Sequence, residues 1–520
     1  MATPPSPSPS PPPPPSLPSL AEVIFSSEQA NHNFSRILGD LKRANLSITN
    51  RLRSIRHDAA FVARVAAARR PLPLPLVANE RCGSWYIDPA LKAASAYFKS
   101  TDGHTGQWKF STRRVNLHLL DLIAQHNGFW PARAGLGVAT GSCIIVDSTR
   151  RGKRIPDALS KTVPIWCAVL NRALFPEAPA AWHALHVPPN VVSASEQSQI
   201  EARLPRFVAD FLALEIDLAP LQQRLRNKPL RPLWVTQDDF HDDDDFEGSG
   251  SELGLYPVVC CTSSRRVAGG TEVGEGAGYI QGAGDDTENW ALGLTAPLFW
   301  AHADALLTTP EHELPALIQR LVAAADAVTV TTELVQVAPC LAIGVLPPSP
   351  AARAALTVAS ASGATTCVVA LVPAATDAAS WEKSPSHLEV GLGGKSKAAS
   401  RALRAALPRI CDFVSRFLLR PDGDDDVGGG SSLGGAAEKR AVAIVCESGK
   451  DLSVGVALAL YCWCFDSSGQ NLLLVGGDRE PFTKTKIRVK LGHILNRVPD
   501  ANPSRATLQS VNSFLMGWRE

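Results

Sequence analysis

The sequence predicts an α/β protein in two parts, and three observations lead to this fold class. The chain has 520 residues, which is more than one ordinary hydrophobic core organises. Its last third orders strand, helix, strand, loop and helix, which favours a largely parallel sheet flanked by helices. The segment "AVAIVCESGKDLSVGVALALYC" (441–462) has the layout of a cysteine-phosphatase phosphate loop. We therefore expect a mixed α/β N-terminal domain followed by a phosphatase-like C-terminal domain.

Changes in composition along the chain suggest the domain boundaries. Residues 1–22 form a Pro- and Ser-rich tail that we expect to be disordered, and they lack the basic segment and apolar core of a secretory signal. The N-terminal domain is expected at 23–345 and the C-terminal domain at 346–520. An acidic loop is expected at 238–252, and a flexible Gly- and Asp-rich insertion at 421–437.

Hydrophobic periodicity places the elements of the N-terminal domain. Apolar residues recur at helical spacing over 26–70, until "PLPLP" (71–75) ends the pattern. The other expected elements are strands at 84–88 and 142–147, a helix at 113–128 closed by Gly128, a helix at 156–174 begun by Pro156, and a helix at 312–327.

In the C-terminal domain, strands are expected at 365–373 and 441–445. A helix from Ala398 places five apolar residues on one stripe, with Pro408 as a kink, and a second helix begins at Ser453. The stripe consists of Leu403, Leu407, Ile410, Val414 and Phe417.

The charges are segregated along the chain although they nearly cancel. Net charge is +1, but residues 31–170 hold 21 Lys and Arg against 8 Asp and Glu, and residues 236–290 hold 13 acidic residues and two arginines. This suits a protein that binds a polyanion on one surface. The eleven cysteines show neither CxxC pairs nor zinc spacing, so we expect no disulfide or zinc site. We also expect no membrane span, and a cytoplasmic protein.

The loop after Cys446 lacks the residue that a phosphatase needs. A catalytic arginine would stand six positions after the cysteine, where this chain has Leu452. The amides of 447–452 and the start of the following helix can still bind a phosphate without cleaving it. A loop that binds nothing stays an alternative. The candidate phosphate-binding residues are Cys446, Ser448, Gly449, Lys450, Asp451 and Ser453.

Three polar stretches of the N-terminal domain carry further candidate site residues. The loop 147–161 crowds cations around hydroxyls and a glycine, which is typical of polyphosphate or nucleic-acid binding. The stretch 97–118 combines basic residues and histidines with aromatics. His104 lies there in a polar turn, either as a candidate base or as a contact to RNA or phosphate. The turn 278–290 places Asp285 and Asp286 beyond two glycines, where they can hold Mg²⁺ or sugar hydroxyls, or form a surface turn only.

Taken together and in this order, these stretches resemble the eukaryotic initiator tRNA 2′-O-ribosylphosphate transferases. The resemblance covers about 25–518 and lies in "FKSTDGH", "RRVNLHLL", "DSTRRGKRIPDALSKTVPIWCAVLNR", "YIQGAGDD", "CESGKDLSVGVAL" and "NPSRATLQSVNSFLMG". It implies transfer of a 5-phosphoribosyl group from phosphoribosyl pyrophosphate to the 2′-hydroxyl of one T-stem adenosine in initiator tRNA. It also implies a C-terminal part like a dual-specificity phosphatase.

Chemistry assigns roles to the candidate residues in such a reaction, and these roles are hypotheses. Cations and Mg²⁺ must neutralise the leaving pyrophosphate, and one group must take the proton of the 2′-hydroxyl. For catalysis we expect His104, Asp102, Arg150, Lys153, Arg154 and Lys161. For the donor we expect Asp147, Ser148, Thr149, Gln281, Gly282, Gly284, Asp285 and Asp286, the last two with Mg²⁺. For RNA we expect Lys99, Arg113, Arg114 and His118.

One departure and two alternatives remain at this point. Ordinary phosphoribosyltransferases have an aliphatic strand before their two acids and a Thr–Gly loop after them, and "GAGDDTEN" (282–289) has neither. A cysteine-dependent hydrolase and a non-catalytic tRNA-binding protein are the competing functions. The transferase hypothesis fails if the 147–161 loop is packed away from any cavity and lies far from both the 278–290 turn and the Cys446 loop. The sequence leaves open whether the two domains share one cleft.

Overall fold

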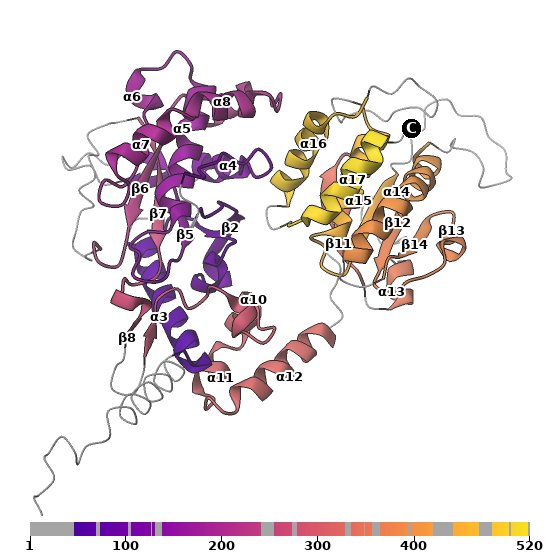
Figure 1. Ribbon diagram of the computed structural model, residues 1–520, viewed down its shortest axis with the longest axis horizontal. Coiled ribbons are helices and arrows are strands. Elements are labelled where there is room, and N and C mark those ends of the chain that lie inside the picture. The colour runs from indigo at the N-terminus through magenta and orange to yellow at the C-terminus, as the bar shows by residue number, and fades with distance from the viewer. Residues whose placement is uncertain are drawn as a thin grey trace, which may run out of the picture.

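Figure 1 shows the fold of the chain as a computed structural model with two parts, each built on its own sheet. The first part extends to the end of helix α12 (Leu314–Ala327), which runs toward the second part. The structure describes residues 46–68, 73–101, 106–125, 127–130, 138–240, 254–272, 278–327, 334–347, 349–355, 365–393, 397–419, 440–466, 481–498 and 501–517. The expected tail and insertion, and most of the acidic loop, lie outside these residues.

A five-stranded sheet with the order β2-β1-β5-β7-β6 organises the first part. All four neighbouring pairs run parallel, so the carboxyl ends of the strands meet at one edge of the sheet. The central strands β5 and β7 are buried along their whole length, as in parallel sheets covered on both faces. The strands are β1 (Leu76–Asn79), β2 (Lys92–Ala96), β5 (Cys143–Asp147), β6 (Leu230–Val235) and β7 (Tyr256–Thr262).

Helices cover both faces of this sheet and create two apolar layers. Successive strand side chains point to opposite faces, so Val77 belongs to one layer and Ala78 to the other. The first layer packs against α4 (His118–Gln125), α5 (Val163–Leu174), α7 (Ala194–Glu201) and α8 (Leu204–Leu212). The second packs against α3 (Ile48–Ala67), α10 (Ala296–Ala301), α11 (Ala303–Thr308) and α12.

Short elements connect these helices and strands. They are η1 (Gly83–Tyr86), η2 (Pro89–Leu91), β3 (Asn127–Trp130), β4 (Val138–Gly141), the π-helical η3 (Ala158–Thr162), α6 (Ala180–His183), α9 (Ala219–Arg224), η4 (Ala268–Gly270), β8 (Thr271–Glu272), β9 (Tyr279–Ile280) and η5 (Thr287–Asn289). The pairs β3/β4 and β8/β9 each form a two-stranded antiparallel sheet.

The second part is a six-stranded, largely parallel sheet with the order β10-β11-β15-β12-β14-β13. Its central four strands run parallel, and an antiparallel strand closes each edge. Helices α14 to α17 pack on one face and bury an extended apolar core (Figure 1). The elements are β10 (Val335–Ala338), β11 (Leu341–Val345), α13 (Pro350–Ala355), β12 (Thr366–Val372), η6 (Ala378–Ser380), β13 (Glu382–Ser384), β14 (His387–Gly391), α14 (Lys397–Leu418), β15 (Ala441–Cys446), α15 (Leu452–Cys464), α16 (Lys484–Arg497) and α17 (Arg505–Gly517).

The expected fold class is confirmed, and most expected elements are present. The strands β5, β12 and β15 and the helices η3–α5, α12, α14 and α15 lie where the sequence predicts them. The apolar stripe of α14 is buried, and Pro408 lies inside this helix. Strands β10 and β11, which precede the expected boundary at 345/346, belong to the second sheet. We propose a boundary between α12 and β10.

Two expected elements of the first part are wrong. The segment 84–88 is no strand: 3₁₀-helix η1 occupies it, and a Cβ at Gly83 would lie 2.4 Å from the carbonyl oxygen of Val146. The helix expected at 113–128 begins only at His118, since Asn116 has a φ of 54°, which a right-handed helix excludes. This helix ends at Gln125, and Gly128 lies in β3.

Candidate functional site

The carboxyl edge of the first sheet gathers polar residues from three neighbouring strands. Asn79, Asp147 and Thr262 are the last residues of β1, β5 and β7, and all three are buried. In open α/β sheets this edge is where ligands bind, because loops rather than helices cover it. The turns 148–157 and 278–290 lie over it.

Asp147 is the anchor of this edge. Its side chain is fully buried and accepts hydrogen bonds from Asn79 Nδ2 (2.9 Å), Cys82 Sγ (3.0 Å) and the Ser148 amide (2.8 Å). The guanidinium of Arg81 donates to both of its oxygens at 3.3 Å and to the carbonyl of Ser148 at 2.6 Å. Five donors thus hold Asp147 in place.

Asp285 faces the same guanidinium from the 278–290 turn. Its Oδ2 lies 3.7 Å from Arg81 Nη2 and 3.4 Å from Arg150 Nε. Burial raises the pKa of Asp285, and the two arginines oppose that rise. The neighbouring Asp286, in the left-handed region with a φ of 50°, is half-exposed and forms an ion pair with Arg150 Nη1.

Several buried polar atoms at this edge lack a hydrogen bond, although Asp285 Oδ2 lies near two guanidinium groups. Among the described residues, Ser148 Oγ, Thr262 Oγ1 and both oxygens of Asp285 are buried without a hydrogen bond. Buried polar atoms in native proteins nearly always have a partner, so a cluster of orphaned ones is typical of a place where a polar ligand binds. The edge can therefore accept hydroxyl or phosphate groups.

The loop 147–161 and the turn 278–290 are packed against each other, as the sequence hypothesis requires. Gln281 accepts a hydrogen bond from the Gly152 amide (2.9 Å) and donates to the Lys153 carbonyl (2.7 Å). A Cβ at Gly282, whose φ is +71°, would lie 2.6 Å from the Thr149 carbonyl oxygen, so only glycine fits there. The amide of Gly284 donates to the hydroxyl of Tyr86 (2.8 Å).

A polar pocket of about 430 Å³ adjoins the other end of the 147–161 loop. Lys161 Nζ lies 3.4 Å from Asp157 and 2.8 Å from Glu196, and Lys153 Nζ lies 3.6 Å from Asp157. Ion pairs thus fix both lysines at the pocket wall. The lining residues are Thr101, Gly106, Trp108, Lys153, Asp157, Lys161, Ser193, Ser195, Glu196 and Gln199.

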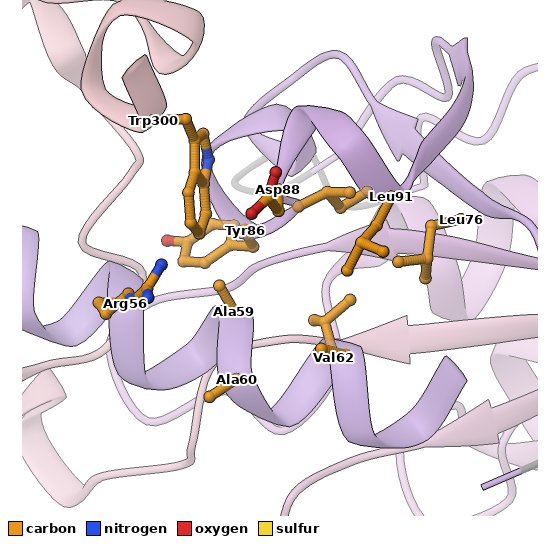
Figure 2. A pocket seen from close by; sticks show the side chains of 11 residues that line it. Arg56, Ala59, Ala60, Val62, Leu76, Tyr86, Asp88, Leu91 and Trp300 are labelled. Carbon is orange, nitrogen blue, oxygen red and sulfur yellow. The ribbon is translucent and has the colours of Figure 1, made fainter. Parts of the chain in front are cut away.

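A second pocket, of about 240 Å³, lies between α3, η1, η2 and α10 and has a different character (Figure 2). Aliphatic side chains form much of its wall, and the guanidinium of Arg56 lies 5.4 Å from the ring centroid of Trp300. Figure 2 shows the Tyr86 ring beside Trp300. The hydroxyl of Tyr86 reaches the 278–290 turn, so this aromatic ring separates the apolar pocket from the polar edge.

The remaining predicted residues of the first part lie in varied surroundings. Arg154 forms an ion pair with Asp239, and Lys99 and Arg113 are exposed. His118 begins α4; its Nε2 contacts the Ser95 carbonyl at 2.8 Å, and burial lowers its pKa. Arg114 contacts the second part. Asp102 and His104 lie outside the described residues.

The Cys446 loop follows β15 at the carboxyl edge of the second sheet. Cys446 Sγ is buried and donates to Ser453 Oγ at 3.2 Å. The amide of Gly449 bonds the Cys446 carbonyl (3.1 Å), and that of Lys450 bonds Ser448 Oγ (3.2 Å). Two of the amides expected to hold phosphate are therefore engaged within the loop. A Cβ at Gly449 would lie 3.1 Å from Gly344, so close packing on β11 also requires this glycine.

Sequence reasoning missed Arg81, Asn79 and Cys82, which complete the site around Asp147. The signal was "VANERC" (77–82), where polar residues follow a short apolar run. The strand expected at 84–88 hid this signal, because it placed residues 79–82 before a strand, whereas they lie at the end of β1 and directly after it.

The residues expected to hold Mg²⁺ do not form a ready cation site. Arg81 and Arg150 flank Asp285, and Arg150 also pairs with Asp286, so a cation there would meet two guanidinium charges. Within the part of the chain that the structure describes, no group of three His, Cys, Asp or Glu side chains is placed to bind a metal.

A buried carboxylate supports the 278–290 turn from α3. Asp58 is fully buried; the hydroxyl of Tyr279 donates to both of its oxygens (2.9 and 3.0 Å), and Gln237 Nε2 donates at 2.9 Å. Burial raises its pKa from the usual 3.8 to about 6, against the opposing hydrogen bonds from His57, Tyr279 and Gln237. Compared with the unfolded chain, the folded protein therefore favours the neutral form of the Asp58 side chain.

This shift predicts a pH dependence of stability. Between about pH 4 and pH 6 the folded state binds more protons than the unfolded chain, so the free energy of unfolding should fall by roughly 3 kcal/mol as pH rises, and level off above pH 6. Asp58→Asn should remove this slope in urea unfolding at pH 4.5, 5.5 and 6.5. Asp238→Asn, at an exposed aspartate, is the control and should keep it. An unchanged slope in Asp58→Asn would show that the carboxyl ionises normally.

The fold and the site define a class: an α/β protein with a polar, arginine-lined site at the edge of a parallel sheet and a phosphatase-like second part without the phosphatase arginine. Family models refine this. A model described as the Rit1 N-terminal domain matches residues 41–323, and one described as the Rit1 DUSP-like domain matches residues 386–515. The chain belongs to the Rit1 family.

Two relatives are similar to this chain. The tRNA A64-2′-O-ribosylphosphate transferase of Saccharomyces cerevisiae is 33% identical over 532 residues, which cover 93% of this chain and 95% of the relative. An uncharacterised protein of Schizosaccharomyces pombe is 45% identical over 276 residues, 52% of this chain and 56% of that protein. No solved structure matches the chain. Among the described residues, no helix is both long and apolar enough to span a membrane.

Proposed function

We propose that this protein transfers a 5-phosphoribosyl group from phosphoribosyl pyrophosphate to the 2′-hydroxyl of a T-stem adenosine in initiator tRNA. The observation that carries the proposal is the similarity, over 93% of the chain, to a relative named as a tRNA ribosylphosphate transferase. The added anionic group would exclude initiator tRNA from elongation.

The loop 147–161 supplies the cations for this reaction. The bond between ribose C1 and pyrophosphate breaks with its electron pair going to pyrophosphate, while the 2′-oxygen forms the new bond to C1. Preorganised cations stabilise the charge that develops on the leaving group. Arg150, Lys153 and Lys161 project from this loop and have carboxylate partners that a phosphate can replace, as does Arg154.

The 278–290 turn receives the ribose in this proposal. Asp285 has two oxygens without hydrogen bonds, and hydroxyl groups are the donors that they lack. Gln281 and Gly282 hold the turn against the 147–161 loop, and Gly284 holds it against Tyr86, so the hydroxyls and the pyrophosphate of one donor molecule can be bound side by side.

Asp102 and His104 remain our candidates for accepting the proton of the 2′-hydroxyl. Thr101 and Gly106, which flank them in the sequence, both line the polar pocket. The exposed cations Lys99 and Arg113 belong to the same stretch and would contact the phosphates of the tRNA, which is read through its shape, phosphates and 2′-hydroxyls. Any Mg²⁺ would arrive bound to pyrophosphate, since Asp285 and Asp286 are already paired with arginines.

Incubation of the full-length protein with unmodified initiator tRNA and ribose-labelled phosphoribosyl pyrophosphate, with and without Mg²⁺, tests this function. We expect label in the tRNA and release of pyrophosphate. Binding of tRNA without consumption of the donor would instead identify a non-catalytic tRNA-binding protein. Hydrolysis of an aryl phosphate would identify a phosphatase, the function that Leu452 argues against.

Cys446→Ser separates the transferase from the hydrolase. The Cys446 thiol is buried and bonded to Ser453, and serine is a close isostere, so we expect transfer activity within about twofold of the original protein. Loss of transfer in a variant with unchanged thermal stability would assign the thiol a chemical role. The assay is the same labelled transfer reaction.

A further inference from the structure

The outer side of the Cys446 loop is covered by the segment 501–507, which precedes and begins α17. The carbonyl of Lys450 accepts a hydrogen bond from the Asn502 amide at 2.8 Å. Asp451 does not cap α15; its Oδ1 accepts hydrogen bonds from the Ser504 amide (2.8 Å) and from Thr507 Oγ1 (2.7 Å). The loop that would hold a phosphate in a phosphatase is thus tied to a segment of its own domain.

The same segment contacts the first part of the chain through Arg114. Nη2 of this arginine donates to the Ala501 carbonyl (3.1 Å) and to Asn502 Oδ1 (2.8 Å). Its guanidinium also lies 4.2 Å from the ring centroid of Tyr97. Asn502 therefore links the Cys446 loop, through its amide, to Arg114, through its side chain. Val489 of α16 also packs on the apolar layer of the first part.

Arg114 belongs to the stretch 106–117, of which Gly106 and Trp108 line the polar pocket. Trp108 is buried, and its Nε1 donates to Glu196 Oε1 at 2.9 Å, the oxygen that also pairs with Lys161. Arg203 lies 4.9 Å from the Trp108 ring centroid and donates to the Gly106 carbonyl at 2.9 Å. Contacts thus hold the stretch 106–117 at its pocket end. At its other end Trp166 Nε1 donates to the Val115 carbonyl at 2.6 Å, and Arg114 adds the bonds to the second part.

We infer that the Cys446 loop is an internal docking face within this chain. Arg114 is a positioning residue, which fixes the stretch 106–117 against the Cys446 loop through Asn502. A docking role explains why the Cys446 loop keeps the layout of a phosphatase loop although two of its amides are hydrogen-bonded within the loop. It also explains why Lys450 and Asp451 are bonded to the segment 501–507. The inference rests on contacts and holds independently of which reaction the pocket supports.

Hydrogen exchange on the full-length protein tests the inference without any substrate. Asn502→Ala, in the second part, should make amide exchange in peptides covering 106–117 of the first part about tenfold faster, because a charged hydrogen bond across the contact is lost. Arg505→Ala, an exposed arginine of the same segment, is the matched control and should leave these peptides unchanged. No acceleration in Asn502→Ala, or uniform acceleration in both parts, would overturn the inference.

Arg114→Lys separates positioning from simple charge. Lysine keeps the charge, but its ammonium cannot lie over the Tyr97 ring as the guanidinium does while Nη2 donates to both Ala501 and Asn502, so exchange in 106–117 should again be about tenfold faster. Full protection with lysine would show that charge alone is required. In the transfer assay, the Asn502→Ala variant should have a raised KM for the donor. A chain that shows the exchange effect but transfers nothing would refute the proposed function and leave this inference intact.

Discussion

Replacement of Arg150 by alanine is expected to lower kcat/KM for ribosylphosphate transfer by about 10²- to 10³-fold, the usual loss when one electrostatic donor to a developing anion is removed. Arg150 lies between Asp285 and Asp286 at the point where the two site turns meet. Its side chain is 36% exposed, so its loss should change the free energy of unfolding by less than about 1 kcal/mol. Initial rates with labelled donor and urea unfolding measure the two effects.

Arg151→Asn provides the control for Arg150→Ala. Arg151 is the next residue, is exposed, and has a φ of 56°, a conformation that asparagine tolerates. This variant should transfer at nearly the original rate. If Arg150→Ala keeps full activity, or if both variants lose it equally, the specific role of Arg150 in binding pyrophosphate is refuted.

Arg81→Met should cost about 3–5 kcal/mol of folding free energy, the usual cost of removing one partner from a buried ion pair. Without this guanidinium, Asp147 loses two hydrogen-bond donors. The buried side chains of Asp147 and Asp285 also lose the positive charge that lies between them. The measurement is urea unfolding at pH 7. Transfer activity should be lost as well, since the edge of the sheet would no longer hold its turns.

Two further variants make the Arg81 result interpretable. Lys92→Met removes the cation of a half-exposed pair with Glu80 nearby, and should cost less than about 1 kcal/mol. Combining Arg81→Met with Asp147→Asn removes one stranded charge and should restore part of the stability. A small cost for Arg81→Met, equal to that of Lys92→Met, would mean that water or a rearrangement solvates the carboxylates.

The fold class was predictable because long apolar runs and helical stripes carry strong periodic signals. The buried strands β5, β12 and β15 and the α14 stripe are of this kind. The approach of the 147–161 loop to the 278–290 turn was predictable as a requirement of the chemistry, and Gln281 and Gly282 show how it is achieved.

The sequence could not predict what depends on contacts between distant segments. Trp85 and Tyr86 have the composition of a strand, yet close packing at Gly83 folds them into a 3₁₀-helix. Arg81 gains its importance from Asp147 and Asp285, which lie 66 and 204 positions further along the chain. No local pattern marks such a residue.

In the proposed transferase, the pairing of Arg81 and Arg150 with carboxylates would make binding of the donor an ion-exchange step. A monovalent anion such as chloride gains little by displacing Asp286 from Arg150, because it trades one charge contact for an equal one. A pyrophosphate ester carries several charges on one group and would replace several carboxylate contacts at once. The carboxylate counterions would therefore favour multivalent anions over monovalent ones.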